Sequence, residues 1–264
     1  MKGTPLSGRT VVVTGGSRGI GRATAVAAAR AGADLVLVAR TADTLAETAR
    51  LVRDTGRRAT AYALDLRDLP ATEALATRVT DEVGLPDVVV LNAGHSVARG
   101  VLECAGRFDT YERLTTLNYL SPLAFLGPLL PLMAERGSGH VIGVTSATTR
   151  TPVPGWGAYT ASKAALDSWL RSARPELASA GIDVTVCQPP LVDTDMIRPV
   201  HGRSRWAIPP ERVARWLVGA MVDPVPEVGP WYVRPGSVAV AAAPYLSARV
   251  LGALSRRRPR GIRD

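Results

Sequence analysis

The stretch Val11-Val12-Val13-Thr14-Gly15-Gly16-Ser17-Arg18-Gly19-Ile20-Gly21 decides the fold of this chain. A short β-branched run leads into a glycine-rich turn and then into an alanine-rich segment that ends near Ala31, which predicts strand, turn and helix in that order. Gly15, Gly19 and Gly21 permit a tight turn and a close approach of the backbone to a pyrophosphate at the helix N-terminus. A glycine-rich turn that binds nothing is the alternative. The motif therefore favours a dinucleotide site that a second motif has to support.

Short apolar runs recur along the chain and alternate with helical stretches, without internal repeats or low-complexity linkers. We expect strands at residues 10–14, 35–39, 59–64, 88–91, 141–145, 183–187 and 231–233. This alternation predicts one α/β domain, a doubly wound Rossmann-type fold with a parallel sheet of about seven strands and helices on both faces. A chain of 264 residues with 46% apolar content can bury the core of such a domain. We place this domain at residues 1–236, followed by a C-terminal helix and basic tail at residues 237–264.

A second motif lies in Ala158-Tyr159-Thr160-Ala161-Ser162-Lys163. Tyr159 and Lys163 share a helix face at positions i and i+4, so we expect the ammonium to lie near the phenol and to lower its pKa from about 10 toward neutral pH. Such a phenol can both give and take a proton. Ser146, thirteen residues before Tyr159, can hold the same substrate oxygen. The three residues indicate protonation of a carbonyl, although an isolated pair with this spacing can be a surface tyrosine beside a solvated lysine.

From about Leu6 to Val233 the chain resembles the short-chain dehydrogenase/reductase family. The matching residues, in the family's order, are Thr14 to Gly21, Asp65, Asn92-Ala93-Gly94, Asn118, Ser146, Tyr159 with Lys163, and Pro189 to Thr194. Four of these motifs, at Gly15 to Gly21, Asn92 to Gly94, Ser146 and Pro189 to Thr194, follow the first, fourth, fifth and sixth predicted strands, so they converge on one crevice at the C-terminal edge of the sheet. Pro190 is a departure, because the family usually has glycine there and proline fixes φ in the loop near the nicotinamide.

The resemblance implies hydride transfer between a nicotinamide and a carbonyl carbon. It assigns Tyr159 as acid/base, Ser146 to polarise the oxygen, Lys163 to tune Tyr159 and hold ribose, and Asn118 to complete a proton relay. The expected cofactor-binding residues are Gly15, Ser17, Arg18, Gly19, Ile20, Gly21, Arg40, Asp65, Leu66, Asn92, Ala93, Gly94, Tyr159, Lys163, Pro189, Val192 and Thr194. Asp65 would contact the adenine and Thr194 the carboxamide. No metal is expected.

The end of the second predicted strand favours NADP over NAD. NAD-binding members of this fold carry an acidic residue there to hold the ribose hydroxyls, whereas an arginine suits the 2′-phosphate of NADP. This strand ends in Ala39-Arg40, and Arg18 in the glycine turn adds a second cation. Both arginines can instead be ordinary surface charges.

Pro122 has a specific consequence for Asn118. Proline lacks an N–H, so it cannot bond to the Asn118 carbonyl four residues earlier, and the freed oxygen can hold a water. The resemblance implies that this water links to Lys163 and relays protons from solvent. The alternative is that Pro122 only bends a packing helix.

The substrate is the part of the function that the sequence describes least. The segment 196–208 mixes apolar and basic residues where relatives have a mobile substrate-covering segment, and Trp156 and His95 can face the crevice. We expect substrate contacts from Ser146, Trp156 and Tyr159, and an apolar ketone or aldehyde as substrate. Packing is the alternative role for Trp156. His95 and His201 are expected to be ordinary polar residues, because Tyr159 already supplies the acid/base function.

Composition bounds the compartment and the partners. The only two cysteines, Cys104 and Cys187, lie far apart in the sequence, which argues against a disulfide framework and favours a reducing compartment. The first strand starts near Arg9 and leaves no room for a signal peptide, so we expect a cytoplasmic protein. We expect a homodimer or homotetramer that acts on a small carbonyl or alcohol, and no nucleic-acid partner.

The C-terminal tail carries much of the positive charge. Five arginines, Arg256, Arg257, Arg258, Arg260 and Arg263, oppose Asp264 and give the last nine residues +4 of the chain's +9. Before them, Leu246, Val250 and Leu254 recur every four residues and predict an apolar helical stripe. Such a helix can pack on its own subunit or on a partner, lie at a membrane surface, or contact nucleic acid.

Two classes of function remain open at this point. The first is an NADP(H)-dependent oxidoreductase that interconverts a ketone or aldehyde and an alcohol. The second is a catalytically idle NADP-binding regulator or membrane-tethered scaffold on the same fold, because fold alone does not establish function.

Overall fold

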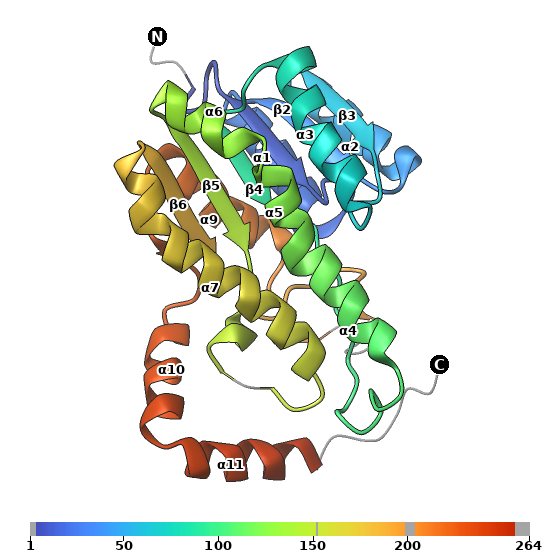
Figure 1. The fold of residues 1–264 in the computed structure, drawn as a ribbon, viewed down its shortest axis with the longest axis vertical. Helices are drawn as coiled ribbons and strands as arrows, with labels where there is room; N and C mark the ends of the chain where they lie inside the picture. Colours follow the sequence, from blue (N-terminus) through green and yellow to red (C-terminus); the bar gives the residue numbers. More distant parts are fainter. Residues whose placement is uncertain (1–3, 152, 199–203, 257–264) are drawn as a thin grey trace.

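A seven-stranded parallel sheet forms the centre of the molecule, with the strand order β3-β2-β1-β4-β5-β6-β7 (Figure 1). The computed structural model describes residues 4–151, 153–198 and 204–256. The strands are β1 Thr10–Thr14, β2 Asp34–Ala39, β3 Ala59–Ala63, β4 Val88–Leu91, β5 Gly139–Val144, β6 Ile182–Cys187 and β7 Glu227–Val228. The order reverses next to β1, so the crevice for a ligand lies at the C-terminal ends of β1 and β4.

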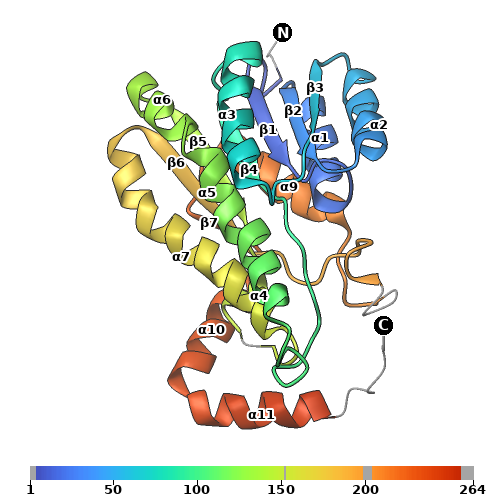
Figure 2. The same ribbon diagram turned by 45° about the vertical axis from the view of Figure 1, so that its right-hand side comes forward.

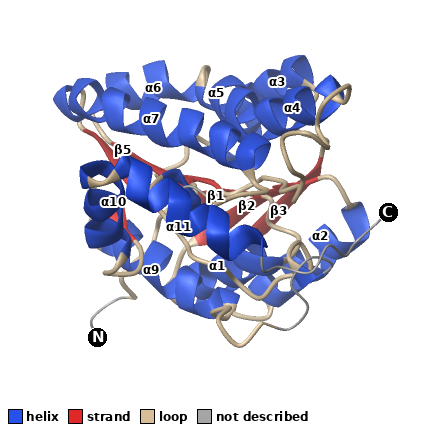
Figure 3. Cartoon of the chain, turned by 90° about the horizontal axis from the view of Figure 1, so that it is seen from below, coloured by secondary structure: helices blue, strands red, loops and turns tan. Residues whose placement is uncertain are grey.

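Helices cover both faces of the sheet, as Figure 3 shows from below. They are α1 Gly19–Arg30, α2 Ala42–Arg53, α3 Leu69–Val83, α4 Phe108–Thr115, α5 Ser121–Leu126, α6 Leu129–Arg136, α7 Gly157–Ser179, α9 Pro210–Val222, α10 Val233–Ala242 and α11 Pro244–Arg256, with a π-turn η1 at Thr116–Leu120 and a 3-10 turn η2 at Ala147–Thr149. Helices α1, α2 and α9 lie on one face, and α3 to α7 lie on the other. The predicted doubly wound fold is confirmed.

The core explains why the central strands read as continuous apolar runs. Val11 and Val13 pack into the layer with α1 and α9, while Val12 points to the opposite layer with α3 and α7, and all three are fully buried. A parallel strand that is covered on both faces needs apolar residues at every position. Both cysteines are buried and free, as expected.

The strand predicted at residues 231–233 is wrong. The seventh strand is β7, whose Val228 pairs with Cys187 of β6. Gly229 and Pro230 end it, because proline cannot donate to a sheet ladder, and the Val233 N–H donates to the Pro230 carbonyl as the chain turns into α10.

The two C-terminal helices extend from the body of the molecule. Figures 1 and 2 show α10 descending from the sheet and α11 lying below the C-terminal ends of the strands. The predicted helix in this region is confirmed as α11, and the boundary expected between residues 236 and 237 falls within α10. The arginines of residues 257–264 lie outside the described residues.

Candidate active site

The glycine turn after β1 has a shape that side chains would block. Gly15 and Gly19 have φ values of +68° and +54°, a region that favours glycine. A Cβ on Gly15 would lie 2.9 Å from the Ala93 Cα, and one on Gly21 would lie 2.1 Å from the Gly15 carbonyl oxygen. The backbone is therefore open to close approach at the start of α1, which fits the pyrophosphate of a dinucleotide.

Hydrogen bonds lock this turn onto the end of β4. Asn92 donates its side-chain amide to the carbonyls of Thr14 at 2.9 Å and Gly15 at 3.2 Å. The Thr14 hydroxyl accepts the N–H groups of Asn92 and Ala93 and donates to the Val90 carbonyl. Thr14 is a residue that the sequence reasoning missed as a site residue, although its position between the strand and the glycines was a usable signal. Asn92 supports the turn with its side chain, so its predicted cofactor role has a structural component.

Positive charge gathers beside the turn. Arg18 and Arg40 are exposed, and neither has an ion-pair partner among the described residues. Hydrogen bonds from Arg67, together with the charge of Arg40, hold the pKa of Asp65 below its usual range. Burial lowers the pKa of His95, and nearby arginines, including Arg18 and Arg40, lower it further. This cluster of cations suits a phosphate group.

The other predicted cofactor-binding residues differ in how deeply they are buried. Leu66 is in the core, so only its backbone can face a ligand, while Ile20 is partly buried against the α1 layer. Ser17 is buried, and its carbonyl accepts from Arg22 at 3.0 Å.

Tyr159 lies in the first turn of α7, beside Ser146 at the end of β5. Burial raises the pKa of Tyr159, while the Ser146 hydroxyl, within hydrogen-bond reach of the phenol, lowers it. Ser146 also accepts from the Thr148 hydroxyl at 2.9 Å. Trp156 is buried and packs edge-on against the Tyr159 ring, with the centroids 5.8 Å apart. The predicted trio of Ser146, Tyr159 and Trp156 is brought together.

Lys163 lies deeper than the sequence suggested. Its side chain is buried, and Nζ donates to the Val144 carbonyl at 2.8 Å. Burial lowers the pKa of Lys163 to about 8. The expectation that Lys163 would lower the Tyr159 pKa is therefore wrong for the chain by itself, because the loss of water around the phenol dominates and the ammonium is bonded to a backbone carbonyl.

Gly94 makes room for Lys163. A Cβ on Gly94 would lie 3.0 Å from both Lys163 Nζ and Asn118 Oδ1. The last residue of the predicted Asn92-Ala93-Gly94 motif thus contributes by leaving space for the Lys163 side chain.

Asn118 is fully buried in the π-turn η1, which ends one residue before α5. The Ser121 N–H donates to the Thr116 carbonyl five residues back, so the helix widens just before Pro122. The Asn118 side chain accepts the His95 N–H at 2.8 Å and donates to the His95 carbonyl and to Ser162 Oγ, each at 2.9 Å. The predicted break is present. Ser162, which the sequence reasoning missed, links Asn118 to the helix of Tyr159.

The loop after β6 closes over the glycine turn. A Cβ on Gly19 would lie 3.0 Å from Thr194 Cγ2, so Thr194 sits against the start of α1. Val192 forms a parallel bridge with Ile208, and the carbonyl of Pro189 accepts from the Ala147 N–H at 2.9 Å. Pro190 is accommodated between these anchor points. His201 lies outside the described residues.

A buried ion network supports this side of the site. Asp167 accepts from Thr145 at 3.2 Å, Gln188 at 2.9 Å and Arg171 at 2.6 Å. Arg171 also pairs with Glu227 of β7. Thr145 and Gln188 immediately precede Ser146 and Pro189, so the network fixes two site loops to α7. The sequence reasoning missed it.

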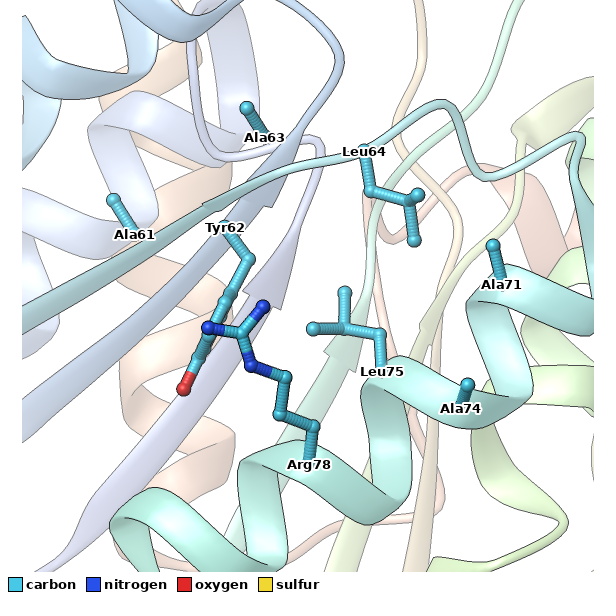
Figure 4. A pocket seen from close by; sticks show the side chains of 8 residues that line it. All are labelled: Ala61, Tyr62, Ala63, Leu64, Ala71, Ala74, Leu75 and Arg78. Atoms are coloured by element: carbon cyan, nitrogen blue, oxygen red, sulfur yellow. The ribbon is translucent and has the colours of Figure 1, made fainter.

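A separate pocket of about 370 Å³ lies between β3 and α3 (Figure 4). Alanine and leucine side chains line most of it, and the Arg78 guanidinium lies over the Tyr62 ring at 5.1 Å. None of the predicted site residues lines this pocket. The chemistry-bearing groups lie instead past the C-terminal ends of β1, β4 and β5.

Comparisons with known proteins agree with this geometry. A sequence model described as short chain dehydrogenase matches residues 9–204. An uncharacterised oxidoreductase of Mycobacterium tuberculosis is 34% identical over 249 residues, which are 93% of this chain and 73% of the relative. A fatty acyl-CoA reductase of Acinetobacter baylyi is 34% identical over 240 residues, which are 90% of this chain and 81% of the relative. The crystal structure of a metagenomic short-chain oxidoreductase in complex with NADP has a TM-score of 0.75 and 32% identity, and covers 86% of this chain and 99% of that chain.

Proposed function

The chain belongs to the short-chain dehydrogenase family and is an oxidoreductase, and on that premise we propose that it uses NADP(H) to interconvert an apolar ketone or aldehyde and its alcohol. The observation that carries the proposal is that Ser146 lies beside Tyr159, while Lys163 on the same helix bonds the carbonyl of Val144, two residues before Ser146, and lies beside Gly94. Such an arrangement would bring a proton donor, a polarising hydroxyl and a cation to one substrate carbonyl.

Arg18 and Arg40 support the choice of NADP(H). Both guanidinium groups stand next to the glycine turn without ion-pair partners among the described residues, and Ala39 supplies no carboxylate for ribose hydroxyls. A 2′-phosphate would give these cations a charge-assisted partner. The solved relative in complex with NADP supports the same preference.

The side chains of this protein would carry the proton half of the reaction. Because burial raises the pKa of Tyr159, its phenol holds its proton at neutral pH and can donate it to a carbonyl oxygen that Ser146 also contacts. Lys163 is charged below about pH 8 and bonds the Val144 carbonyl, which holds it beside Gly94. When bound, a nicotinamide cofactor supplies or accepts the hydride.

Asn118 would fix the loop after β4 and helix α7 relative to each other. Its side chain joins the backbone after Gly94 to Ser162 on α7, and Pro122 lacks the N–H that would bond the Asn118 carbonyl in an α-helix. We infer that this carbonyl holds a water, and that a proton passed from solvent through this water replaces the proton that Tyr159 donates.

Two observations support an apolar substrate. Trp156 packs against the Tyr159 ring, and the Val101 and Leu102 side chains are strongly exposed on the loop that the Arg99 N–H ties to the Gly155 carbonyl at 2.7 Å. A relative at 34% identity is named as a fatty acyl-CoA reductase. We therefore propose a carbonyl on an extended apolar chain.

A turnover screen tests this function. Purified protein is offered aldehydes and ketones of increasing chain length with NADPH or NADH, and consumption of the reduced cofactor is followed. We expect turnover with NADPH and a kcat/KM that rises with chain length. NADPH binding without turnover of any carbonyl would favour an idle NADP-binding protein instead.

A further inference from the structure

We propose that α10 and α11 form a docking face for the surface of an anionic phospholipid bilayer. The docking face consists of Trp231 and Tyr232 before α10, Val238 on α10, and Tyr245, Leu246 and Val250 on α11. These six side chains are between 49% and 87% exposed. Single exposed apolar residues are ordinary, but six within twenty residues of chain at one end of the molecule indicate an interaction surface.

The docking face belongs to a part of the chain that the body of the molecule leaves largely unpacked. The main contacts of α11 are with α10, and α11 lies away from the sheet in both views (Figures 1 and 2). Leu246 and Val250 are one helical turn apart and therefore share a face of α11. Two members of the predicted apolar stripe, Leu246 and Val250, are thus available to an external surface, while the side chain of Leu254 lies outside those described.

The charge of this segment indicates what kind of surface binds to the docking face. Residues 233–264 contain seven arginines and a single acidic residue, Asp264, so this segment carries six of the nine excess positive charges of the chain. Arg249 is exposed on α11 itself. An amphipathic helix with an apolar stripe and neighbouring arginines binds the interface of anionic lipid, where apolar burial and charge attraction act together.

The same charge argues against a second copy of the chain. Two such faces would bring like charges together when they met, which opposes association. Nucleic acid would neutralise the arginines but would leave Leu246 and Val250 without an apolar partner.

The geometry favours an interfacial helix over a spanning one. Helix α11 has 13 residues, fewer than the roughly 20 that cross a bilayer. Within the described residues, no single helix is long and apolar enough to cross a membrane, and one bent pair, 108–126 with 129–136, passes on length and composition alone.

Docking would point the substrate side of the site toward the bilayer. Gly236 of α10 lies beside Thr151, since a Cβ there would be 3.9 Å from the threonine hydroxyl. Residue 151 belongs to the loop that leads into α7 and Tyr159, and Val101, on the loop between β4 and α4, lies next to Gly157, the first residue of α7. Resting on the proposed function, we infer that an apolar carbonyl substrate enters the site from the membrane surface.

Vesicle sedimentation tests the docking face. The full chain is mixed with vesicles of phosphatidylcholine alone or with phosphatidylglycerol added, at low and high salt. We expect binding to the anionic vesicles that weakens with salt. The double variant Leu246→Glu and Val250→Glu should bind at least tenfold more weakly, whereas Val222→Glu should bind like wild type. Val222 is a matched control because it is 47% exposed, against 49% for Val250, and it ends α9, a helix outside the docking face.

Several outcomes would overturn the proposal. Wild-type protein that ignores anionic vesicles, or a double variant that binds as well as wild type, would remove the lipid role. A subunit number that falls in the double variant without vesicles would identify a second copy as the occupant, and binding to a short DNA duplex in place of vesicles would identify nucleic acid. Thermal unfolding checks that each variant is folded. Turnover of a soluble short-chain aldehyde without vesicles tests the oxidoreductase activity separately.

Discussion

At the scale of single residues, the fold acts on Tyr159 and Lys163 by removing water from both. Burial disfavours the charged form of each group, so the pKa of the phenol rises while the pKa of the ammonium falls to about 8. The neutral phenol is then the dominant form at neutral pH, and the lysine is poised to titrate just above it. This pairing suits proton donation to a carbonyl, and hence reduction.

Arg40 should decide between the two nicotinamide cofactors. Arg40→Ala removes a charge-assisted contact to a 2′-phosphate, so NADPH affinity should fall by about 1.5–3 kcal/mol while NADH affinity hardly changes. Titration calorimetry measures both. Arg50→Ala is the matched control, because Arg50 forms an exposed pair with Asp54 on α2. Wild-type protein that binds NADPH and NADH equally well would contradict this role.

At the scale of elements, the first strand, turn and helix were predictable because every local signal agreed there. The β-branched run of β1, the positive-φ glycines and the alanines of α1 all specify one local structure. The edge strand β7 was not predictable, because it has two residues and is defined by pairing with β6 rather than by its own composition. The aromatic residues at 231–232 had a strand-like composition but follow Pro230 into a helix.

The Asp167 network also escaped prediction, for a physical reason. Its members come from β5, α7, β6 and β7, and only the folded sheet brings them within hydrogen-bond distance. A charge on α7 has no sequence signal that distinguishes a buried ion pair from a solvated one. By contrast, Tyr159 and Lys163 are related by helix spacing, which sequence does reveal.

Breaking this network should cost substantial stability. Asp167→Asn keeps the size of the side chain but removes the carboxylate that accepts from Arg171, which is partly buried and keeps its pairing with Glu227, so the free energy of unfolding should fall by about 1–3 kcal/mol. Denaturant unfolding measures the loss. Asp54→Asn removes a carboxylate from an exposed pair and should cost about 0–1 kcal/mol. Equal effects of the two substitutions would show that the network does not hold the loops.

His140 on β5 should make the free energy of unfolding depend on pH in the acid range. Its ring is buried, with Nε2 2.8 Å from the Thr185 hydroxyl, and burial lowers its pKa from 6.5 to about 4. Between these values the unfolded chain binds a proton that the folded chain does not, so the free energy of unfolding falls as pH drops from about 6.5 to about 4. The loss should reach on the order of 3 kcal/mol.

Comparing wild type with His140→Gln isolates that effect from the carboxylates. Denaturant unfolding of both proteins at about pH 7 and about pH 4.5 should show a larger acid loss in the wild type. Parallel losses in the two proteins would mean that His140 does not titrate as described.

At the scale of the whole molecule, topology turns scattered motifs into one crevice. Gly15 and Asn92 meet because β1 pairs with β4, and Ser146 approaches Pro189 because β5 pairs with β6. Parallel strands bring their C-terminal ends to one edge, so the motif order and the strand order together predicted the convergence. The arrangement of α10 and α11 outside the body was not predictable, because an apolar stripe does not reveal what covers it.

The basic tail should be separable from the folded body. Truncation after Ser255 removes five arginines, a proline and a glycine, a composition that cannot bury enough apolar area to offset ordering. The melting temperature and the turnover of a soluble substrate should be unchanged, while binding to anionic vesicles should weaken by about 1 kcal/mol for each arginine that lies near the surface. Loss of thermal stability would instead make the tail part of the body.

The central claim is that Tyr159 protonates a carbonyl while NADPH reduces it. The most direct measurement follows deuterium into the alcohol during a single turnover from NADPH that carries deuterium at both hydrogens of nicotinamide C4, with wild-type protein and Tyr159→Phe. We predict a labelled alcohol from wild type, and NADPH binding that is nearly intact in the variant with a rate about 10²–10⁴-fold lower, because only the transferable proton is lost. An unlabelled product, or a variant that reacts at close to the wild-type rate, would contradict the claim.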